Sequence, residues 1–135
     1  MATYNKFNSM AAAPYNKVHN FASDQLVVLL TNIAPIAGDS VTADITQIAY
    51  TNLSSRNILT ISSDQIGGSY KLLLTDLVLS ASGAVAPFRY VVIANSTATN
   101  GELIAWFDYG SSLTMANGET FTVDFQSVTG LLSNS

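Results

Sequence analysis

The stretch LIAWFDYGSSL, Leu103 to Leu113, holds the only tryptophan of the chain and two further aromatic residues. Its residue types predict a β-strand that ends at Gly110, before a final hairpin. Side chains alternate between the two faces of a strand. The predicted core face consists of Leu103, Ala105, Phe107 and Tyr109. The opposite face, with Ile104 and Trp106, is also apolar, and a strand that is apolar on both faces needs a cover on each side. The N-terminal arm, another sheet or another subunit could provide the second cover.

The run FRYVVIA, Phe88 to Ala94, is expected to pair with this strand through the loop 95–101. Placing Asn95 opposite Gly101 predicts one face with the pairs Val92–Ile104, Tyr90–Trp106 and Phe88–Asp108. The other face would then hold the pairs Ile93–Leu103, Val91–Ala105 and Arg89–Phe107. In this arrangement Arg89 and Asp108 would meet as an ion pair near the end of the hairpin. A slip of one residue would exchange the faces.

Short β-rich segments separated by turn signals fill the rest of the chain. The turn signals are Gly38-Asp39, Gly67-Gly68, Asn100-Gly101 and Asn117-Gly118. The segments are residues 25–31, 45–51, 57–62, 69–81, 88–94, 102–109, 112–116 and 120–125. Because no β-α-β alternation occurs, the pattern predicts an all-β, single-domain antiparallel β-sandwich, either jelly-roll-like or Ig-like.

The firmest local prediction is a hairpin at Asn117-Gly118, the residue pair preferred in two-residue type I′ turns. This turn would join Ser111–Ala116 to Glu119–Phe125. The second strand alternates strictly, with its apolar side chains on one face and Thr120, Thr122 and Asp124 on the other. Such alternation is typical of a half-buried strand.

Residues 1–20 are predicted to form an N-terminal arm or short helix, and residues 21–135 the β-sandwich domain. Pro14 would end a helix there, and a frayed terminus is the alternative. Apolar side chains in the arm and on the central hairpin are candidates for an interface with a neighbouring subunit. The interface candidates are Tyr4, Phe7, Tyr15, Val18, Phe88, Tyr90, Ile104 and Trp106.

The composition favours partners over nucleic acid or membrane. Only 10% of the residues are charged, against about 25% in an average soluble domain. The five basic residues are scattered, so no basic stripe is available for nucleic acid. The longest strongly apolar run, Leu26–Leu30, is too short to cross a membrane. A charge-poor surface rich in aromatic residues is typical of interface cores, which favours a homo-oligomer.

No constellation of residues points to catalysis. His19 is the only histidine and no cysteine is present, which disfavours a catalytic triad and a zinc site. Asp39 and Asp44 could supply oxygens to a loop cation, although they lack EF-hand spacing. We therefore predict a protein that is not an enzyme, with no catalytic, cofactor-binding or metal-ligating residues. Tyr90 and Trp106 could alternatively form a platform on which sugars stack.

Several strings of the chain resemble a family of small virion-associated proteins of tailed bacteriophages. The strings are KVHN (17–20), LLTNIAP (29–35), DITQIAYTNLSSR (44–56), SYKLLLTDLVLSASG (69–83), APFRYVVI (86–93), WFDYGSSL (106–113) and NGETFTVDF (117–125). The resemblance covers almost the whole chain from Lys17 onward. The first sixteen residues depart from the family pattern, in which a more regular amphipathic helix is expected.

The resemblance implies a structural component of the virion that decorates and cements the capsid by bridging neighbouring capsid subunits. It implies the major capsid protein as partner, a trimer as the oligomer, and the capsid surface as location after assembly in the bacterial cytoplasm. The family has no catalytic residues to transfer. Two alternatives stay open: a tail tube, head–tail connector or tail-fibre component, and a glycan- or receptor-binding module of the virion.

Overall fold

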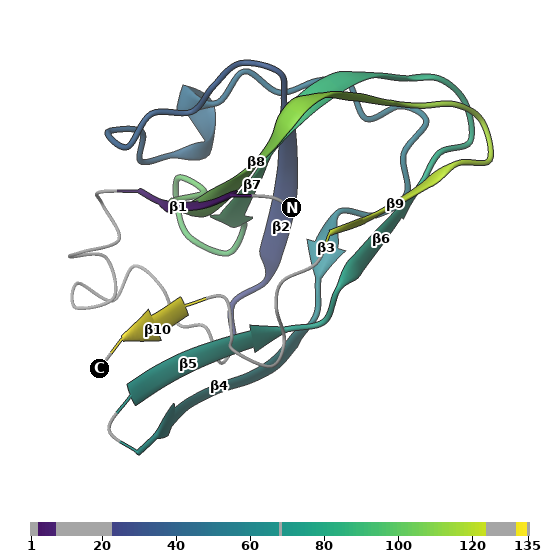
Figure 1. Ribbon diagram of the computed structural model, residues 1–135. Coiled ribbons are helices and arrows are strands. Elements are labelled where there is room, and N and C mark those ends of the chain that lie inside the picture. The colour runs from purple at the N-terminus through teal and green to yellow at the C-terminus, as the bar shows by residue number, and fades with distance from the viewer. Residues whose placement is uncertain (1–2, 8–22, 68, 124–131, 135) are drawn as a thin grey trace.

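The chain is described from a computed structural model, which places residues 3–7, 23–67, 69–123 and 132–134. These residues form antiparallel strands and loops, with one short 3₁₀ turn, η3 (Thr42–Asp44) (Figure 1). Every strand pair among them is antiparallel. The all-β, antiparallel prediction is therefore confirmed, while the jelly-roll or Ig-like sandwich stays a prediction.

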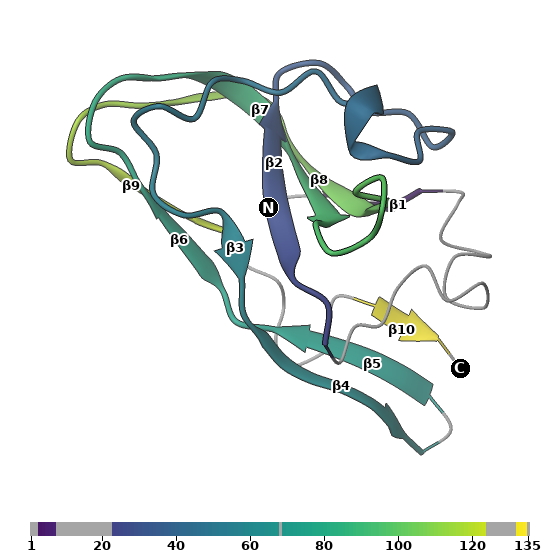
Figure 2. The same cartoon turned by 180° about the vertical axis from the view of Figure 1, so that it is seen from behind.

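The main sheet has five strands in the order β1-β8-β7-β2-β3. Their bounds are Thr3–Lys6 for β1, Leu26–Thr31 for β2, Asn57–Ile58 for β3, Val85–Asn95 for β7 and Leu103–Met115 for β8. The three central strands carry the most apolar runs of the chain, and the segments Leu26–Thr31, Tyr90–Asn95 and Leu103–Phe107 are almost entirely buried. Figure 2 shows the molecule from behind, with β2 crossing its middle in front of β7 and β8.

The strands β7 and β8 continue as a ribbon that bends over one face of the sheet. β6 (Leu77–Ser80) precedes β7 and pairs with β9 (Thr120–Val123), which follows β8. In Figure 1 this ribbon curves over the top of the molecule and returns downward as β6 and β9. It therefore supplies both part of the main sheet and the strands that lie across it.

The predicted hairpin at Asn117-Gly118 is corrected by this arrangement. The turn exists, with the Glu119 amide donating to the Ala116 carbonyl at 3.0 Å. The strands on either side of it do not pair with each other, since β8 pairs with β7 and β9 with β6. Gly118 and Glu119 both bond to Ala81, so two residues oppose one. Such a bulge bends the ribbon and makes the turn a corner.

Further predictions of strand limits are wrong. The predicted strand 69–81 is divided into Ser69–Leu74 and Leu77–Ser80, which lie in different sheets. β8 runs through Gly110 to Met115, because Gly110 adopts a φ of 85° and forms a bulge where a strand end was expected. Residues 45–51 form no strand. They cross the edge of β2, where the Ile48 amide donates to the Leu30 carbonyl and the Tyr50 hydroxyl accepts from the Leu30 amide. These single hydrogen bonds pair the backbone groups of Leu30 at the edge of β2 without forming a continuous strand ladder.

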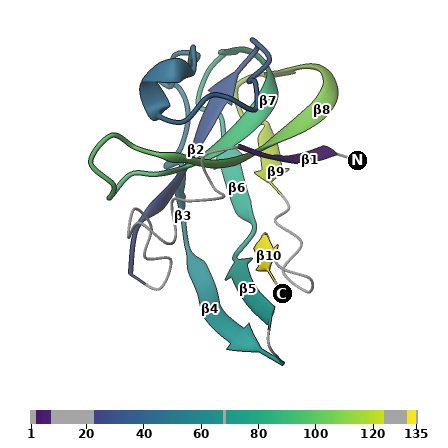
Figure 3. The ribbon, with the colours of Figure 1, turned by 90° about the vertical axis from the view of Figure 1, so that its left-hand side faces the viewer.

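A second hairpin extends away from this body. β4 (Thr60–Ile66) and β5 (Ser69–Leu74) pair with each other, and the chain turns at Gly67, the first of the two glycines predicted to form the turn. β10 (Leu132–Asn134) pairs with β5. Gly67 adopts a φ of 60°, which glycine reaches at no steric cost. Figure 3 shows this hairpin reaching below the main sheet.

The described side chains form a hydrophobic cluster on each face of the main sheet. The larger, inner cluster lies between the sheet and the bent ribbon. Its members are Leu26, Val28, Leu30, Ile58, Leu74, Leu79, Ala81, Val85, Phe88, Val91, Ile93, Ile104, Ala105, Phe107, Met115 and Val123. The smaller, outer cluster, on the opposite face, contains Phe7, Leu29, Ile45, Tyr90, Val92, Ala94, Leu103 and Trp106.

The predicted division at residue 20 is only partly visible. β1 belongs to the predicted arm, yet it is an edge strand of the main sheet, with Tyr4 opposite Phe107. Residues 8–22 lie outside the described residues, and with them Tyr15, Val18 and His19. The boundary between arm and domain stays a prediction.

Candidate functional site

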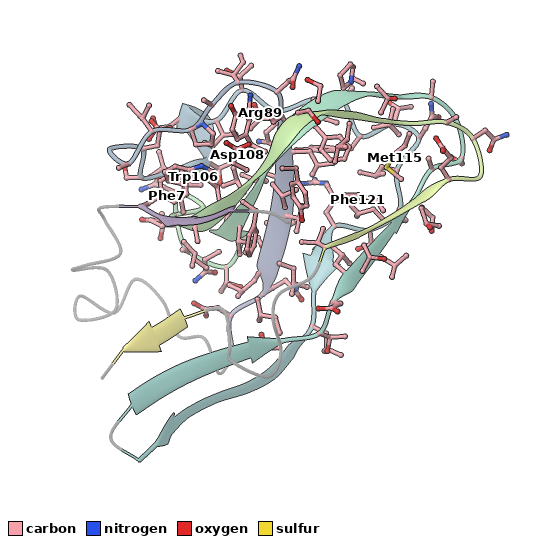
Figure 4. The ribbon with its side chains drawn as sticks, in the orientation of Figure 1. Phe7, Arg89, Trp106, Asp108, Met115 and Phe121 are labelled. Carbon is pink, nitrogen blue, oxygen red and sulfur yellow. The ribbon has the colours of Figure 1, made fainter. Side chains whose placement is uncertain are left out.

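The candidate site is the aromatic outer cluster around Trp106. Trp106 lies on β8 opposite Val92 of β7, and its side chain is only 9% exposed. The ring of Phe7 covers it at a centroid distance of 4.6 Å and a tilt of 48° (Figure 4). Pairing of β1 with residues 105–108 of β8 delivers Phe7, which follows β1 directly, to this position. Phe7 is fully buried.

A loop of the same chain adds a second cover. Ile45, directly after η3, is buried in the outer cluster. The Asp44 carboxylate accepts hydrogen bonds from the amides of Ser40 and Val41. These two bonds hold the pKa of Asp44 below its ordinary value, since they favour the charged form. The second apolar face of the sheet is thus covered by its own chain, and it requires no neighbouring subunit.

The register of β7 and β8 differs from the predicted one by two residues. Tyr90 lies opposite Asp108 and Ile93 opposite Ala105. Asn95 bonds to Glu102 rather than facing Gly101. The cause is the loop that follows Asn95. The buried Asn95 side chain accepts hydrogen bonds from the amides of Thr97 and Ala98 and donates one to the Asp24 carboxylate. A side chain bonded in this way fixes where the loop begins.

A bulge also exchanges two side chains between the faces. Ala94 pairs with Leu103 and Ile93 with Ala105, so Ile104 is the extra residue. Leu103, predicted to lie with Ala105, therefore belongs to the outer cluster, and Ile104, predicted beside Trp106, belongs to the inner one. Strict alternation fails here because a bulge places consecutive residues on one side.

The interface candidates with described side chains are interior residues. Phe7, Phe88 and Ile104 are completely buried, and Tyr90 and Trp106 are 8% and 9% exposed. In this conformation they offer almost no surface to a partner, because strand pairing and Phe7 cover them. The Tyr4 side chain lies outside the described residues, as do Tyr15 and Val18.

The same burial corrects the sugar-platform alternative. A sugar stacks on an aromatic face that solvent can reach. The face of Trp106 is occupied by Phe7, and Tyr90 is buried in the same outer cluster. These two rings therefore do not form an accessible platform.

The predicted ion pair between Arg89 and Asp108 is present (Figure 4). Arg89 Nε and Nη2 donate to Asp108 Oδ1 and Oδ2 at 2.8 and 3.2 Å, and Oδ1 also accepts from the Gly110 amide. The hydrogen bonds from Arg89, and then that from Gly110, keep the pKa of Asp108 below its ordinary value. The pair spans the irregular part of the β7–β8 ladder, so its role is to hold the bulge at Gly110.

Two features of the structure were missed in the sequence. Arg56 stacks over the Tyr50 ring at 3.7 Å and donates to the Val28 carbonyl, which ties residues 50–56 to β2. Ile33 and Ile36 are exposed on a loop. The available signal was the string NIAPIAG (32–38), in which apolar residues alternate with turn formers outside any strand.

Among residues 3–7, 23–67, 69–123 and 132–134, no group of three or more His, Cys, Asp or Glu is placed to hold a metal ion. The carboxylate of Asp39, the other suggested cation ligand, accepts a hydrogen bond from the Ile36 amide. The described part of the chain also contains no helix of the length and apolarity that a membrane span requires.

Comparison of the chain with protein-family models, with curated proteins and with solved structures finds no match. The resemblance to virion-associated proteins of tailed bacteriophages stays a prediction.

Proposed function

We propose that the chain is a non-enzymatic structural protein of a bacteriophage virion, which decorates the capsid and stabilises it by bridging neighbouring capsid subunits. The observation that carries the proposal is the projecting β4–β5 hairpin. Its strands pair with each other and with β10, and neither strand belongs to the five-stranded sheet. In Figures 1 and 3 the hairpin reaches away from the body that holds both clusters.

A projecting hairpin suits a bridging protein for a physical reason. Among the described residues β4 is an edge strand of the three-stranded sheet β10-β5-β4, and the edge of a sheet can template pairing with another chain. Contact with another chain would pair this edge, as in peptide recognition by strand addition. The hairpin thus supplies an arm, and the body supplies a rigid anchor with its two clusters.

The composition and the polar contacts support the same role. With 10% charged residues, the surface resembles an interface core, from which charged residues are depleted. Asp44 and Asp108, two carboxylates near turns, are bonded to their own backbone or to Arg89. Both serve to hold loops in place, which is a structural use of the groups that an enzyme would use for catalysis.

The proposal includes a homotrimer and a location on the outer surface of the shell. Electron microscopy of particles of the virus that encodes the chain tests it. We expect density for the chain distributed over the shell, between neighbouring capsid subunits. Density confined to the tail tip or to the head–tail junction would contradict the proposal.

A further inference from the structure

An exposed apolar loop lies apart from both clusters. The loop Asn32–Asp39, called here the isoleucine loop, presents Ile33 and Ile36 with 60% and 64% of their surfaces exposed. Ala34 and Ala37 are exposed as well, and only Pro35 is buried. Single exposed apolar residues are common on protein surfaces. Two isoleucines three residues apart, with exposed alanines beside them, form a continuous apolar tip.

The isoleucine loop is held in one shape by hydrogen bonds at both ends. Thr31 Oγ1 accepts from the Ile33 amide at 3.1 Å. At the other end the Asp39 carboxylate accepts from the Ile36 amide, and the Asp39 amide donates to the Ile36 carbonyl. These bonds turn the loop at both isoleucines and are made entirely within it and its flanking residues.

A third bond ties the loop to the main sheet. The Ser112 hydroxyl of β8 donates to the Asn32 carboxamide oxygen at 2.7 Å. Because the loop is ordered before any contact is made, binding costs little conformational entropy. An ordered loop with an apolar tip is therefore suited to docking.

The charges around the isoleucine loop are acidic. Asp39 ends the loop, Asp44 bonds to Ser40 next to it, and Glu102 lies opposite Val41. Both described arginines are engaged within the chain: Arg56 stacks on Tyr50, and Arg89, next to the residue that pairs with Thr31, is neutralised by its ion pair with Asp108. The apolar tip is thus bordered by carboxylates.

We propose that the isoleucine loop is a docking site for another protein, whose surface offers an apolar pocket bordered by lysine or arginine. The acidic border selects this occupant by charge complementarity. Contact with a second copy through the same loop would bring like charges together. A membrane surface is disfavoured because interfacial anchors are aromatic or basic, and the loop Asn32–Asp39 contains neither type.

The position of the loop connects this inference to the proposed function, on which it rests for the identity of the partner. In Figures 1 and 2 the segment that contains the loop and η3 lies at one end of the molecule, and the β4–β5 hairpin at the other. A protein with contacts at both ends can touch two capsid subunits. The pocket would therefore lie on the capsid subunit.

The test uses the full chain and shells of the encoding virus assembled without it. Binding is measured by cosedimentation for the wild type, for Ile33→Ser with Ile36→Ser, and for a matched control, Leu59→Ser with Val78→Ser. Leu59 and Val78 are exposed apolar residues, 71% and 52%, outside the loop. We expect the affinity of the loop variant for shells to fall by about tenfold or more. The control should bind within about twofold of the wild type, and both variants should keep the thermal midpoint of the wild type.

A second pair of substitutions tests the acidic border. Asp39→Asn with Glu102→Gln keeps oxygen acceptors for the amides of Ile36 and Asn100 and removes two charges. We expect slower association with the shells and a weaker dependence of the association rate on salt. If the association rate and its salt dependence equal those of the wild type, the inference that lysine or arginine borders the pocket of the partner is contradicted.

The remaining outcomes separate the two proposals. Shell binding by the wild type and equally by the isoleucine variant overturns this inference and leaves the proposed function standing. Binding of the wild type to phosphatidylcholine–phosphatidylglycerol vesicles, lost in the isoleucine variant, overturns it in favour of a lipid surface. No binding of the wild type to shells overturns the proposed function and the inference together.

Discussion

Phe7 is the side chain that connects the N-terminal strand to the outer cluster. Its ring lies on Trp106 and is fully buried. Phe7→Ala should lower the free energy of unfolding by about 3 kcal/mol, the lower end of the usual range for such a change. Because Trp106 is the only tryptophan, its fluorescence should also shift to longer wavelength as water reaches it. Urea unfolding followed by fluorescence measures both effects.

The matched control is Phe7→Leu, which keeps an apolar side chain over Trp106. It should retain most of the stability and nearly all of the emission wavelength. If Phe7→Ala and the wild type have the same emission maximum, Phe7 does not cover Trp106 in solution, and the second face of the sheet is left to another cover.

Asp108 predicts how the stability depends on pH. Its pKa is lowered in the folded chain, first by the hydrogen bonds from Arg89 and then by the Gly110 amide. The resulting stabilisation is present above the pKa of the unfolded chain, about 4, and is lost as the pH falls through the lower, folded value. Asp108→Asn should therefore lose stability at neutral pH and show a smaller further loss on acidification below about pH 4.

The measurement is urea unfolding of both proteins at a series of pH values from neutral to acidic. Carbon-13 NMR of the Asp108 carboxyl group gives the direction of the pKa shift independently. A titration midpoint at or above the ordinary value for aspartate would show that the ion pair with Arg89 does not persist in solution.

At the scale of elements, the corner at Gly118 decides how β9 is directed to β6. Gly118 has a φ of 87°, and a Cβ added there would meet no atom within 4 Å. Gly118→Ala should therefore destabilise the chain by about 1 kcal/mol through backbone strain alone. Gly38→Ala is the control, since its added Cβ also meets nothing within 4 Å and its φ is not positive. Thermal unfolding of both variants checks the difference, and equal midpoints would argue against the corner.

The elements that could be predicted are those with a strong local signal. The strands around Leu26–Thr31 and Leu103–Tyr109 follow from uninterrupted apolar runs, and the turn at Gly67-Gly68 from its two glycines. Which strands pair with each other depends on residues far apart in the sequence, so strand pairing could be predicted less well than the strands themselves. The turn at Asn117-Gly118 was visible in the sequence, whereas the pairing of β9 with β6 was not, because a type I′ hairpin and a bulged corner share the same turn residues.

The candidate site illustrates the same limit. The ion pair between Arg89 and Asp108 was predictable, since a shift of two residues in register leaves both near the same bulge. The positions of Leu103 and Ile104 were not, because the bulge at Ile104 changes their faces without a local signal. The cover of Trp106 by Phe7 joins residues far apart in sequence, so the sequence alone left the N-terminal arm, another sheet and another subunit as alternative covers.

At the scale of the whole molecule, the hairpin should be separable from the body. Replacing residues 63–72 by a Gly-Gly turn shortens β4 and β5 and leaves the buried Leu74 in place. We expect the shortened chain to keep the fluorescence maximum of Trp106 and to lose binding to shells. Retained binding would show that the hairpin is not the bridging arm.

The oligomeric state gives a second test at this scale. The proposed trimer of the 14.3 kDa chain should have three times the mass of one chain by native mass spectrometry. The trimer interface must use surface other than Phe88, Tyr90, Ile104 and Trp106, since these residues are buried within one chain. A ring of many subunits would instead favour a tail-tube or connector role.

The most direct test of the central claim is the number of copies of the chain in each virion. Quantitative mass spectrometry of purified particles, with the major capsid protein as internal standard, gives this number. A protein that bridges capsid subunits over the whole shell should be present in hundreds of copies, in a fixed ratio to the capsid protein. A handful of copies per particle would place the chain in the tail or connector and would contradict a decorating role.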